Sequence, residues 1–159
     1  CSGRTGAPQG PRLRPMPAEV AFHFNAPDRV GYACRLLRKA YLKGARLWVR
    51  VPADDLDRLD QALWVAQPGD FVPHSRAGDP IEVVRHSPIH LASGAPDPEG
   101  RQVLVNLCPD LAQDWDRFER VIEVVTQADE DRAPARERWR TYRVQGIEPV
   151  RHDLASAAP

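Results

Sequence analysis

The sequence predicts a three-layer α/β sandwich around a mostly parallel, Rossmann-like sheet, and two patterns carry this prediction. Short apolar runs alternate with longer segments in which apolar residues recur every three or four positions. The first pattern is typical of strands and the second of amphipathic helices. Strands and helices that alternate along a chain form parallel βαβ units with right-handed crossovers. The length of 159 residues suits one domain with a sizeable core.

The first half of the chain predicts two strands and two helices. The strands are the apolar runs Glu19–Phe24 and Arg46–Val51. Between them, NAPDRVGYACRLLRKAYLKG predicts a helix with capping-box spacing at Asn25 and Asp28 and a stop at Gly44. The second helix is ADDLDRLDQALW, which has acids in its first turn, as the helix dipole favours, and a stripe of leucines for burial.

The second half continues the alternation around one long irregular region. A loop rich in Pro and Gly over 65–80 precedes a short strand at Ile81–Val84, and 85–101 predicts an irregular hairpin or variable loop. The later elements are a buried strand, a short helix, the last strand and a final helix, at Gln102–Leu107, Leu111–Glu119, Arg120–Val125 and about 131–145. Gly146 is the predicted stop of the final helix.

Both ends of the chain differ in composition from its middle. Residues 1–16 are rich in Gly, Pro and Arg and cannot bury an apolar face. We expect a disordered extension there, either native or upstream of a true start at Met16. Residues 17–152 form the predicted domain, and 153–159 are expected to be a flexible tail.

Composition and charge exclude several classes of protein. The formal net charge is +0, so no global basic field favours non-specific nucleic-acid binding, and any anion must be bound by a local cluster. Three widely spaced cysteines, Cys1, Cys34 and Cys108, argue against a disulfide scaffold or a zinc knuckle. Because the sequence has no membrane-length apolar run and no secretory signal pattern, we expect a soluble cytoplasmic protein.

The motifs of catalytic, metal and cofactor sites are missing. The loop after the first strand reads FNAPDRVG, which is neither G-x-G-x-x-G nor a Walker A loop, so a nucleotide enzyme is disfavoured. His86 and His90 are interpreted as surface-loop histidines, because Pro88 separates them and no carboxylate completes a metal site. Cys34 and Cys108 are interpreted as small core residues. We therefore expect no cofactor, no metal and no enzymatic activity of the chain itself.

The final helix carries an arc of arginines around a tryptophan. Four residues spaced three or four apart fall within about 100° of a helical wheel: Arg136, Trp139, Arg140 and Arg143. Arg132 extends the arc by one turn if the helix continues through Pro134, and Glu137 points away. One interpretation is ordinary surface ion pairing, with Trp139 packed on the sheet. The others are a socket for an acidic peptide with a hydrophobic, free-carboxylate end, and a site for single-stranded nucleic acid.

A second surface feature follows the second helix. Trp64 ends this helix, and Phe71, Val72 and Pro73 follow in the loop. Large apolar residues in a loop are either tucked beneath it or offered to a partner, and the sequence leaves both open.

Two long motifs resemble one protein family. LDQALWVAQPGDFVPHSRAG is similar to the L-D-x-x-L-W…F-V-P-H-x-x-A-G segment of the chi subunit of bacterial DNA polymerase III holoenzyme. RERWRTYRVQG is similar to the closing R-E-R-x-x-x-Y-R-x-x-G helix of that family, and RLWVRV and FERVIEVV fall in its order and spacing. The resemblance covers residues from Val20 to Ile147, and the loop over 86–101 has no clear family counterpart.

The resemblance implies a non-catalytic clamp-loader accessory subunit in DNA replication, which reaches DNA only indirectly. Chi proteins pair with the psi subunit and bind the acidic, Phe-ended C-terminal tail of single-stranded-DNA-binding protein. The implied tail site is Val125, Arg132, Arg136, Trp139, Arg140 and Arg143. The implied psi surface is Trp64, Phe71, Val72 and Pro73. The alternative is direct binding of single-stranded nucleic acid by the Arg/Trp helix.

Overall fold

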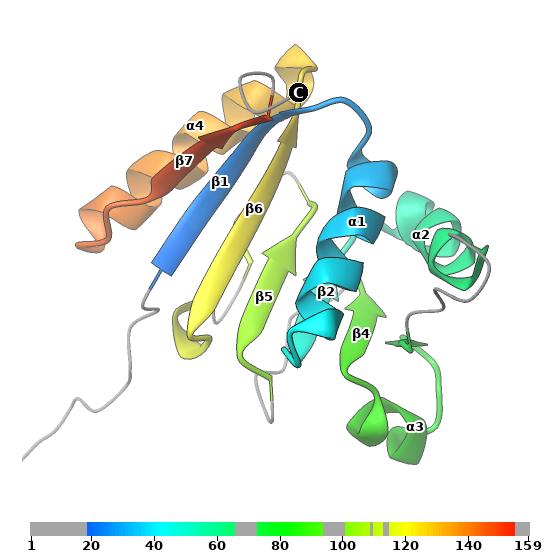
Figure 1. The fold of residues 1–159 in the computed structure, drawn as a ribbon. Coiled ribbons are helices and arrows are strands. Elements are labelled where there is room, and N and C mark those ends of the chain that lie inside the picture. The colour runs from blue at the N-terminus through cyan, green and yellow to red at the C-terminus, as the bar shows by residue number, and fades with distance from the viewer. Residues whose placement is uncertain (1–18, 66–72, 94–100, 109, 113–114, 155–159) are drawn as a thin grey trace, which may run out of the picture.

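A seven-stranded, fully parallel sheet forms the middle layer of the protein (Figure 1). The computed structural model describes residues 19–65, 73–93, 101–108, 110–112 and 115–154. The strand order is β3-β4-β2-β5-β6-β1-β7. The strands are β1 Glu19–Ala26, β2 Leu47–Arg50, β3 Ser75–Arg76, β4 Ile89–Ala92, β5 Val103–Asn106, β6 Arg120–Thr126 and β7 Val150–Asp153.

Helices cover both faces of this sheet, so the predicted three-layer sandwich is confirmed. The helices are α1 Arg29–Leu42, α2 Ala53–Val65, α3 Ile81–His86 and α4 Asp129–Val144, with a 3₁₀ turn at Trp115–Arg117. In Figure 1, α1 and α2 lie in front of the sheet, and α4 lies behind β1 and β7. The result is that α1 and α4 occupy opposite faces.

Each helical layer buries its own apolar cluster against the sheet. On the α1 side, Leu37, Leu59 and Leu63 are fully buried together with side chains of β2, β4 and β5. On the α4 side, Phe22 and Tyr142 are fully buried. Removing such side chains from water is the main stabilising contribution to the fold.

The predicted helix stops are confirmed, and the predicted cap of the first helix is wrong. Gly44 and Gly146 follow α1 and α4 with φ of 82° and 92°, a conformation that glycine adopts without strain. Asp28, not Asn25, caps α1, because its Oδ2 accepts a hydrogen bond from the Gly31 N–H at 3.1 Å. Asn25 lies in β1, where its Nδ2 donates to Asp153 Oδ1 at 2.8 Å.

The strand predicted at Ile81–Val84 is wrong. These residues begin the helix α3, in which Ile81 and Val83 are exposed, and Ser87 closes the helix by donating from Oγ to the Val83 carbonyl at 2.9 Å. A run of four apolar residues does not distinguish a strand from a helix turn.

The irregular region predicted at 85–101 contains a central strand. Its described part includes β4, which is wholly buried between β3 and β2. His90 interrupts the apolar run of this strand, and its ring is nevertheless buried against Trp48, with ring centroids 4.6 Å apart. A polar residue inside a four-residue strand removed the sequence signal of the strand.

Four further elements differ from the predictions. The sequence analysis did not identify β3 or β7, which are short edge strands. The helix predicted at Leu111–Glu119 is only a 3₁₀ turn in its described part. Finally, α4 begins at Asp129, so Pro134 lies in its second turn. The helix is continuous on both sides of Pro134 and includes Arg132. The predicted extension and tail lie almost entirely outside the described residues, so their disorder stays a prediction.

Candidate functional site: a basic groove along α4

A buried carboxylate fixes which side of α4 faces the sheet. Glu123, fully buried on β6, accepts hydrogen bonds from Arg138 Nε at 2.9 Å and Tyr142 Oη at 2.6 Å. Asn106 Nδ2 also donates to it, at 2.9 Å. Burial raises the pKa of Glu123, and the charge of Arg138 together with the donated hydrogen bonds opposes that shift. Arg138 and Tyr142 therefore face inward, and the other arginines of the motif RERWRTYR, Arg136, Arg140 and Arg143, are exposed.

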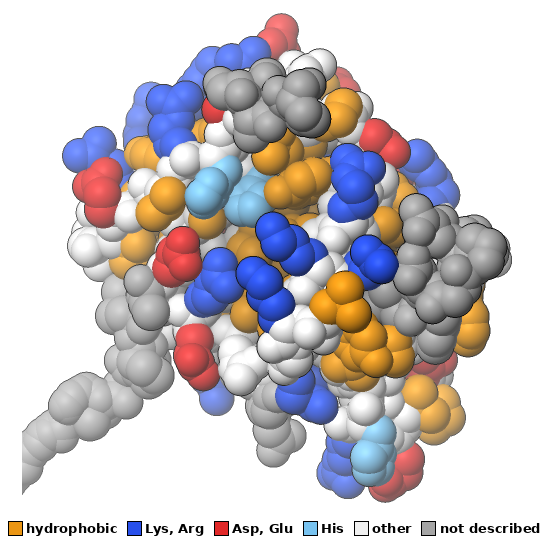
Figure 2. Space-filling view, viewed as in Figure 1, with side chains coloured by type: hydrophobic (Ala, Val, Ile, Leu, Met, Phe, Trp, Pro, Cys, Tyr) orange, Lys and Arg blue, Asp and Glu red, His pale blue; other side chains and the backbone are white. Residues whose placement is uncertain are grey.

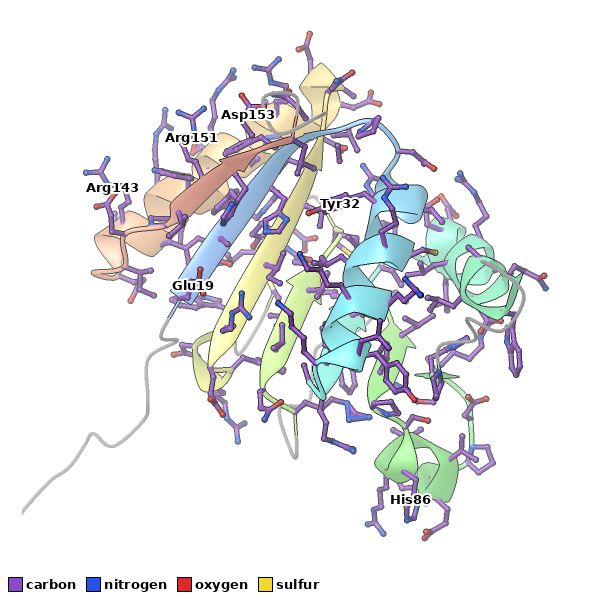
Figure 3. All side chains as sticks on the ribbon, viewed as in Figure 1. Glu19, Tyr32, His86, Arg143, Arg151 and Asp153 are labelled. Atoms are coloured by element: carbon purple, nitrogen blue, oxygen red, sulfur yellow. The ribbon has the colours of Figure 1, made fainter. Side chains whose placement is uncertain are left out.

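The outward side of α4 forms one wall of a groove of about 540 Å³. The five predicted helix residues all line it: Arg132, Arg136, Trp139, Arg140 and Arg143. Phe24 of β1 and Arg151 of β7 also line it, and the sequence analysis did not identify them. Arg143 and Arg151 project to the same side of the molecule in Figure 3.

Aromatic rings give the groove an apolar floor. The half-buried ring of Trp139 packs against Phe22 and Phe24, with ring centroids 5.1 and 6.2 Å away. The guanidinium of Arg151 lies over the Phe24 ring, 5.2 Å from its centroid. Guanidinium groups and ring faces thus stand side by side, as a ligand with both an anionic and an apolar group requires.

The groove has more positive charge than its own carboxylates neutralise. Glu137 does not point away as predicted, because its Oε1 lies 2.6 Å from Arg140 Nη1. Arg143 is 3.8 Å from Glu148, which is a loose contact. Within the described ranges, Arg132 and Arg136 have no carboxylate within ion-pairing distance. The ion-pair interpretation therefore accounts for part of the arc only.

One predicted tail-site residue does not line the groove. Val125 is fully buried on β6, in the apolar cluster beneath α4 that also contains Ala135 and Tyr142. It packs under the buried side of α4. A substitution of Val125 would therefore change the groove indirectly, by disturbing the packing of that helix on the sheet.

Part of the second predicted surface can be placed. Trp64 is 57% exposed at the end of α2, and its ring meets the His74 ring edge-on with centroids 5.6 Å apart. His74 Nε2 is 2.7 Å from Asp60 Oδ1, which holds that ring beneath the tryptophan. Pro73 is half-buried, while Phe71 and Val72 lie outside the described residues.

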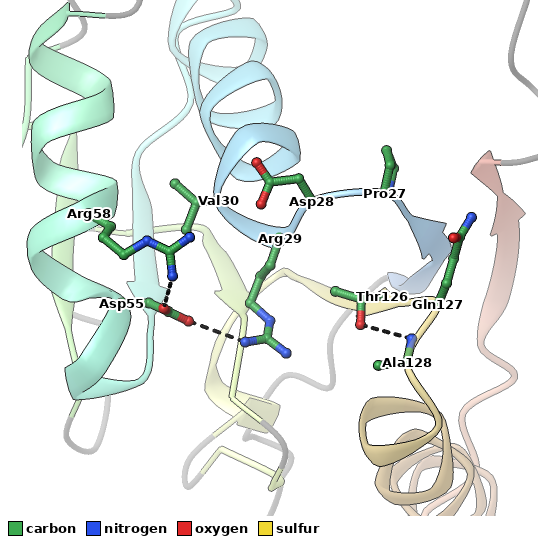
Figure 4. A pocket seen from close by; sticks show the side chains of 9 residues that line it. All are labelled: Pro27, Asp28, Arg29, Val30, Asp55, Arg58, Thr126, Gln127 and Ala128. Carbon is green, nitrogen blue, oxygen red and sulfur yellow. Dashed lines mark hydrogen bonds and ion pairs between the residues drawn. The ribbon is translucent and has the colours of Figure 1, made fainter.

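The crevice where a parallel sheet commonly binds a nucleotide has a different chemistry here. It lies beyond the carboxyl ends of β1 and β6 (Figure 4). Arg29 pairs there with Asp55, at 3.2 Å, and with Asp131, and Asp28 caps α1. Carboxylates thus occupy the helix N-termini that would otherwise face a phosphate. This arrangement ties α1, α2 and α4 together at one end of the sheet.

The other titratable candidates are structural. Burial raises the pKa of Cys34 to about 11 and that of Cys108 above its usual value, so both stay thiols at neutral pH. His86 is exposed on α3, but His90 is buried, so its interpretation as a surface residue is wrong. Burial lowers the pKa of His90, and its Nδ1 is 2.7 Å from Ser75 Oγ.

In the part of the chain that the structure describes, no three His, Cys, Asp or Glu side chains gather closely enough to hold a metal ion. None of the described helices combines the length and apolar composition needed to cross a bilayer.

Comparison with known proteins agrees with the two sequence motifs. The family described as "DNA polymerase III chi subunit, HolC" matches residues 16–150. The DNA polymerase III subunit chi of Pseudomonas aeruginosa is 34% identical over 79% of this chain and 87% of that protein. The chi subunits of Haemophilus influenzae and Escherichia coli are 27% and 29% identical, each over 72% of this chain and over 79% and 78% of their own lengths. The chain therefore belongs to the family of DNA polymerase III chi subunits, which are accessory and not catalytic subunits of that polymerase.

Proposed function

We propose that this protein is an adaptor in DNA replication that binds two partners through separate surfaces. The α4 groove binds the acidic C-terminal tail of single-stranded-DNA-binding protein, and the surface at Trp64 binds the psi subunit of the clamp loader. The observation that carries the proposal is the groove itself, in which Arg132 and Arg136, with no carboxylate partner among the described residues, stand beside an aromatic floor.

The chemistry of the groove suits the end of an acidic peptide. A guanidinium donates two parallel hydrogen bonds to a carboxylate, so Arg132 and Arg136 suit a terminal carboxylate or an aspartate side chain. A terminal phenylalanine ring fits against the rings of Phe24 and Trp139, where it leaves water. Neither the arginines nor the aromatic rings alone would select such a tail, but the two together do.

Fluorescence anisotropy with a labelled acidic peptide ending in Pro-Phe tests this site. Charge-assisted hydrogen bonds contribute about 1.5–3 kcal/mol, so Arg136→Ala should weaken binding by roughly 10- to 100-fold. Arg85→Ala is the matched control, because Arg85 is an exposed arginine on α3, remote from the groove. It should bind like wild type. Equal affinity of wild type and Arg136→Ala would show that the peptide does not use this groove.

The same assay separates the alternative function. A labelled single-stranded oligonucleotide under identical salt measures direct nucleic-acid binding. If α4 binds nucleic acid and not the tail, the oligonucleotide should bind, and Arg136→Ala should abolish that binding while the peptide shows none. The tail proposal requires that the peptide binds, that Arg136→Ala weakens peptide binding, and that this variant leaves any oligonucleotide binding unchanged.

The psi surface is tested by Trp64→Ala. Trp64 is mostly exposed, so its truncation should leave the fold intact, and an exposed tryptophan is a typical anchor of an interface. We expect the variant to lose co-purification with a co-expressed psi subunit while it binds the acidic peptide normally. Retained psi binding would place that interface elsewhere. Together the two contacts would link the clamp loader to the protein-coated single strand.

A further inference from the structure

A second and larger groove lies on the sheet face opposite α4. Its volume is about 830 Å³; its floor comes from β1, β6 and β7, and α1 forms its wall. In Figure 1, no helix crosses in front of β1 and β7 on this side. Figure 2 shows the same face, with histidines and hydrophobic side chains in the middle and lysines and arginines around them. Apart from Arg151, which lines both grooves, no described residue of the proposed tail and psi contacts lines this groove.

The wall of this groove is the most one-sidedly charged element of a neutral protein. From Arg29 to its C-cap Lys43, α1 contains five cations and no carboxylate. Lys39 and Lys43 line the groove. Because they are four residues apart on one helix face, their Cβ atoms lie about 5–6 Å from each other. Two ammonium groups thus follow one another along the wall.

The floor presents ring faces beside this line of charge. His23 of β1 and His152 of β7 are directly opposite in the register, and their ring centroids are 4.8 Å apart. The Tyr32 ring, from α1, meets His23 at 5.7 Å, and its hydroxyl is hydrogen-bonded to His23 Nδ1. Burial, with neighbouring positive charge, lowers the pKa of His23 to about 4, so this ring is neutral at physiological pH.

Among the described residues, the carboxylates that line this groove are Glu119 and Asp153, and Glu19 lies beside the lining residue Arg120. Glu19 pairs with Arg120 at 3.2 Å, and Asp153 accepts a hydrogen bond from Asn25. Glu119 is exposed just before β6. None of them is on the α1 wall, so the wall contributes cations and the floor contributes ring faces.

We propose that this groove binds single-stranded nucleic acid, with phosphates along the two lysines and bases against the floor rings. A line of cations beside stacking surfaces is the arrangement by which proteins bind single strands without reading sequence. An acidic peptide is the less suitable occupant, because it would use the ammonium groups and leave the ring faces uncovered. The α4 groove lies on the other face of the sheet, so the two sites are separate.

Anisotropy of a labelled oligo(dT) at low salt tests the charge line. The double variant Lys39→Glu/Lys43→Glu should bind at least about tenfold more weakly than wild type. Each phosphate contact on a single strand contributes about 0.7 to the log–log salt slope, so this slope should fall by about 1.4. The control Arg85→Glu/Arg117→Glu makes the same change of net charge at exposed residues outside the groove. It should keep both affinity and slope close to wild type.

A footprint on the unmodified protein covers the case in which the double variant does not fold. Lys39 and Lys43 are the only lysines of the chain, so amine acetylation followed by mass spectrometry reports on this groove and on the N-terminal amine. Oligo(dT) should slow acetylation of both lysines and leave the N-terminal amine unchanged.

The ring contribution has its own variant. His152→Ala removes an exposed ring from an edge strand and should weaken oligonucleotide binding by about fivefold or more, at an unchanged salt slope.

Four results would overturn the proposal: no binding of oligo(dT) at low salt, no protection of the lysines, equal losses of affinity in both double variants, or loss of oligo(dT) binding through Arg136→Ala alone. Protection of the lysines by poly-glutamate and not by oligo(dT) would assign the groove to an acidic protein instead. The proposal and the tail contact fail independently, since they use different variants and probes.

Discussion

Glu123 shows how one buried carboxylate determines what the rest of a motif does. Its three donors come from β5 and from two positions on α4 that are four residues apart. This pairing uses Arg138 and Tyr142, so two of the eight residues of the conspicuous sequence RERWRTYR hold the buried carboxylate. The remaining arginines are held at the surface because these two are held in the core.

Tyr142→Phe measures this anchor. The change keeps the ring and leaves the fully buried carboxylate short of one donor, which should cost about 1–3 kcal/mol of unfolding free energy. Urea denaturation gives the value. Tyr41→Phe is the control, because Tyr41 is half-buried on α1 and has no such partner among the described residues. It should cost less than about 0.5 kcal/mol. Equal effects of the two substitutions would mean that the Tyr142 hydroxyl contributes nothing.

His23 makes a second prediction, on stability against pH. Its pKa in the folded protein is about 4, below the ordinary value of 6.5, because burial and nearby positive charge disfavour the protonated ring. The unfolded chain therefore binds more protons, and this contribution to stability is complete above pH 6.5 and is lost as pH falls toward 4. Allowing for the part of the ring that solvent reaches, wild type should lose on the order of 1 kcal/mol more than His23→Gln between pH 7 and 4.5.

The matched measurement uses His86→Gln, at an exposed histidine of α3. Thermal melts across the pH range should show that this variant follows wild type. If His23→Gln also follows wild type, the ring of His23 does not resist protonation in the folded state.

At the scale of the element, the prediction succeeded where periodicity was long and failed where strands were short. The leucine stripe of α2 and the apolar stripe of α1 predicted both helices. Gly44 and Gly146 correctly predicted the ends of α1 and α4, because glycine adopts φ > 0 without strain. β4 was missed because four residues carry no measurable period and His90 makes the run look polar. Arg151 escaped notice for a related reason, since it lies on an edge strand that the sequence analysis did not identify.

The candidate site was predictable to a similar degree. Helical spacing alone brought together the arginines of α4 and Trp139. The contribution of Phe24 comes from a strand 108 to 119 residues away along the chain from these groups, and no local pattern reports such a contact. The pairing of Arg140 with Glu137 depends on side-chain conformations. A helical wheel gives only the direction of each residue around the helix axis, so it could not predict this pairing.

Gly146→Ala tests the end of α4. Because φ is 92° at this residue, a Cβ strains the backbone even though no neighbouring atom lies within 4 Å of its position. The substitution should lower the unfolding free energy by about 1 kcal/mol in urea denaturation. Gln145→Ala, at the exposed residue before it, should change the value by less than about 0.5 kcal/mol. A neutral Gly146→Ala would indicate that the helix ends differently in solution.

At the scale of the whole molecule, the net charge is +0, but clusters of acidic and of basic side chains occupy different places. The acids gather in the first turns of α2 and α4, where helix dipoles favour them: Asp54, Asp55, Asp129, Glu130 and Asp131. Two groups of cations line grooves on opposite faces of the sheet. A protein built this way attracts anions locally without binding them over its whole surface.

This separation predicts simultaneous binding. A saturating acidic peptide should leave the affinity for labelled oligo(dT) unchanged within about twofold, because the sheet stands between the two grooves and Arg151 is the one described residue that lines both. Anisotropy of the oligonucleotide with and without unlabelled peptide measures it, and a scrambled neutral peptide is the control. Displacement of the oligonucleotide would mean that both ligands compete for one surface.

The most direct test of the central claim is a nitrogen–proton NMR titration of the labelled protein with the acidic Pro-Phe peptide. The chain has four tryptophans, so four indole N–H signals report separately on the core, on the α2 surface and on the α4 groove. We expect the Trp139 signal to shift to saturation while the Trp64 signal stays in place. Movement of Trp64 in place of Trp139, or no movement of either, would contradict the assignment of the α4 groove as the tail site.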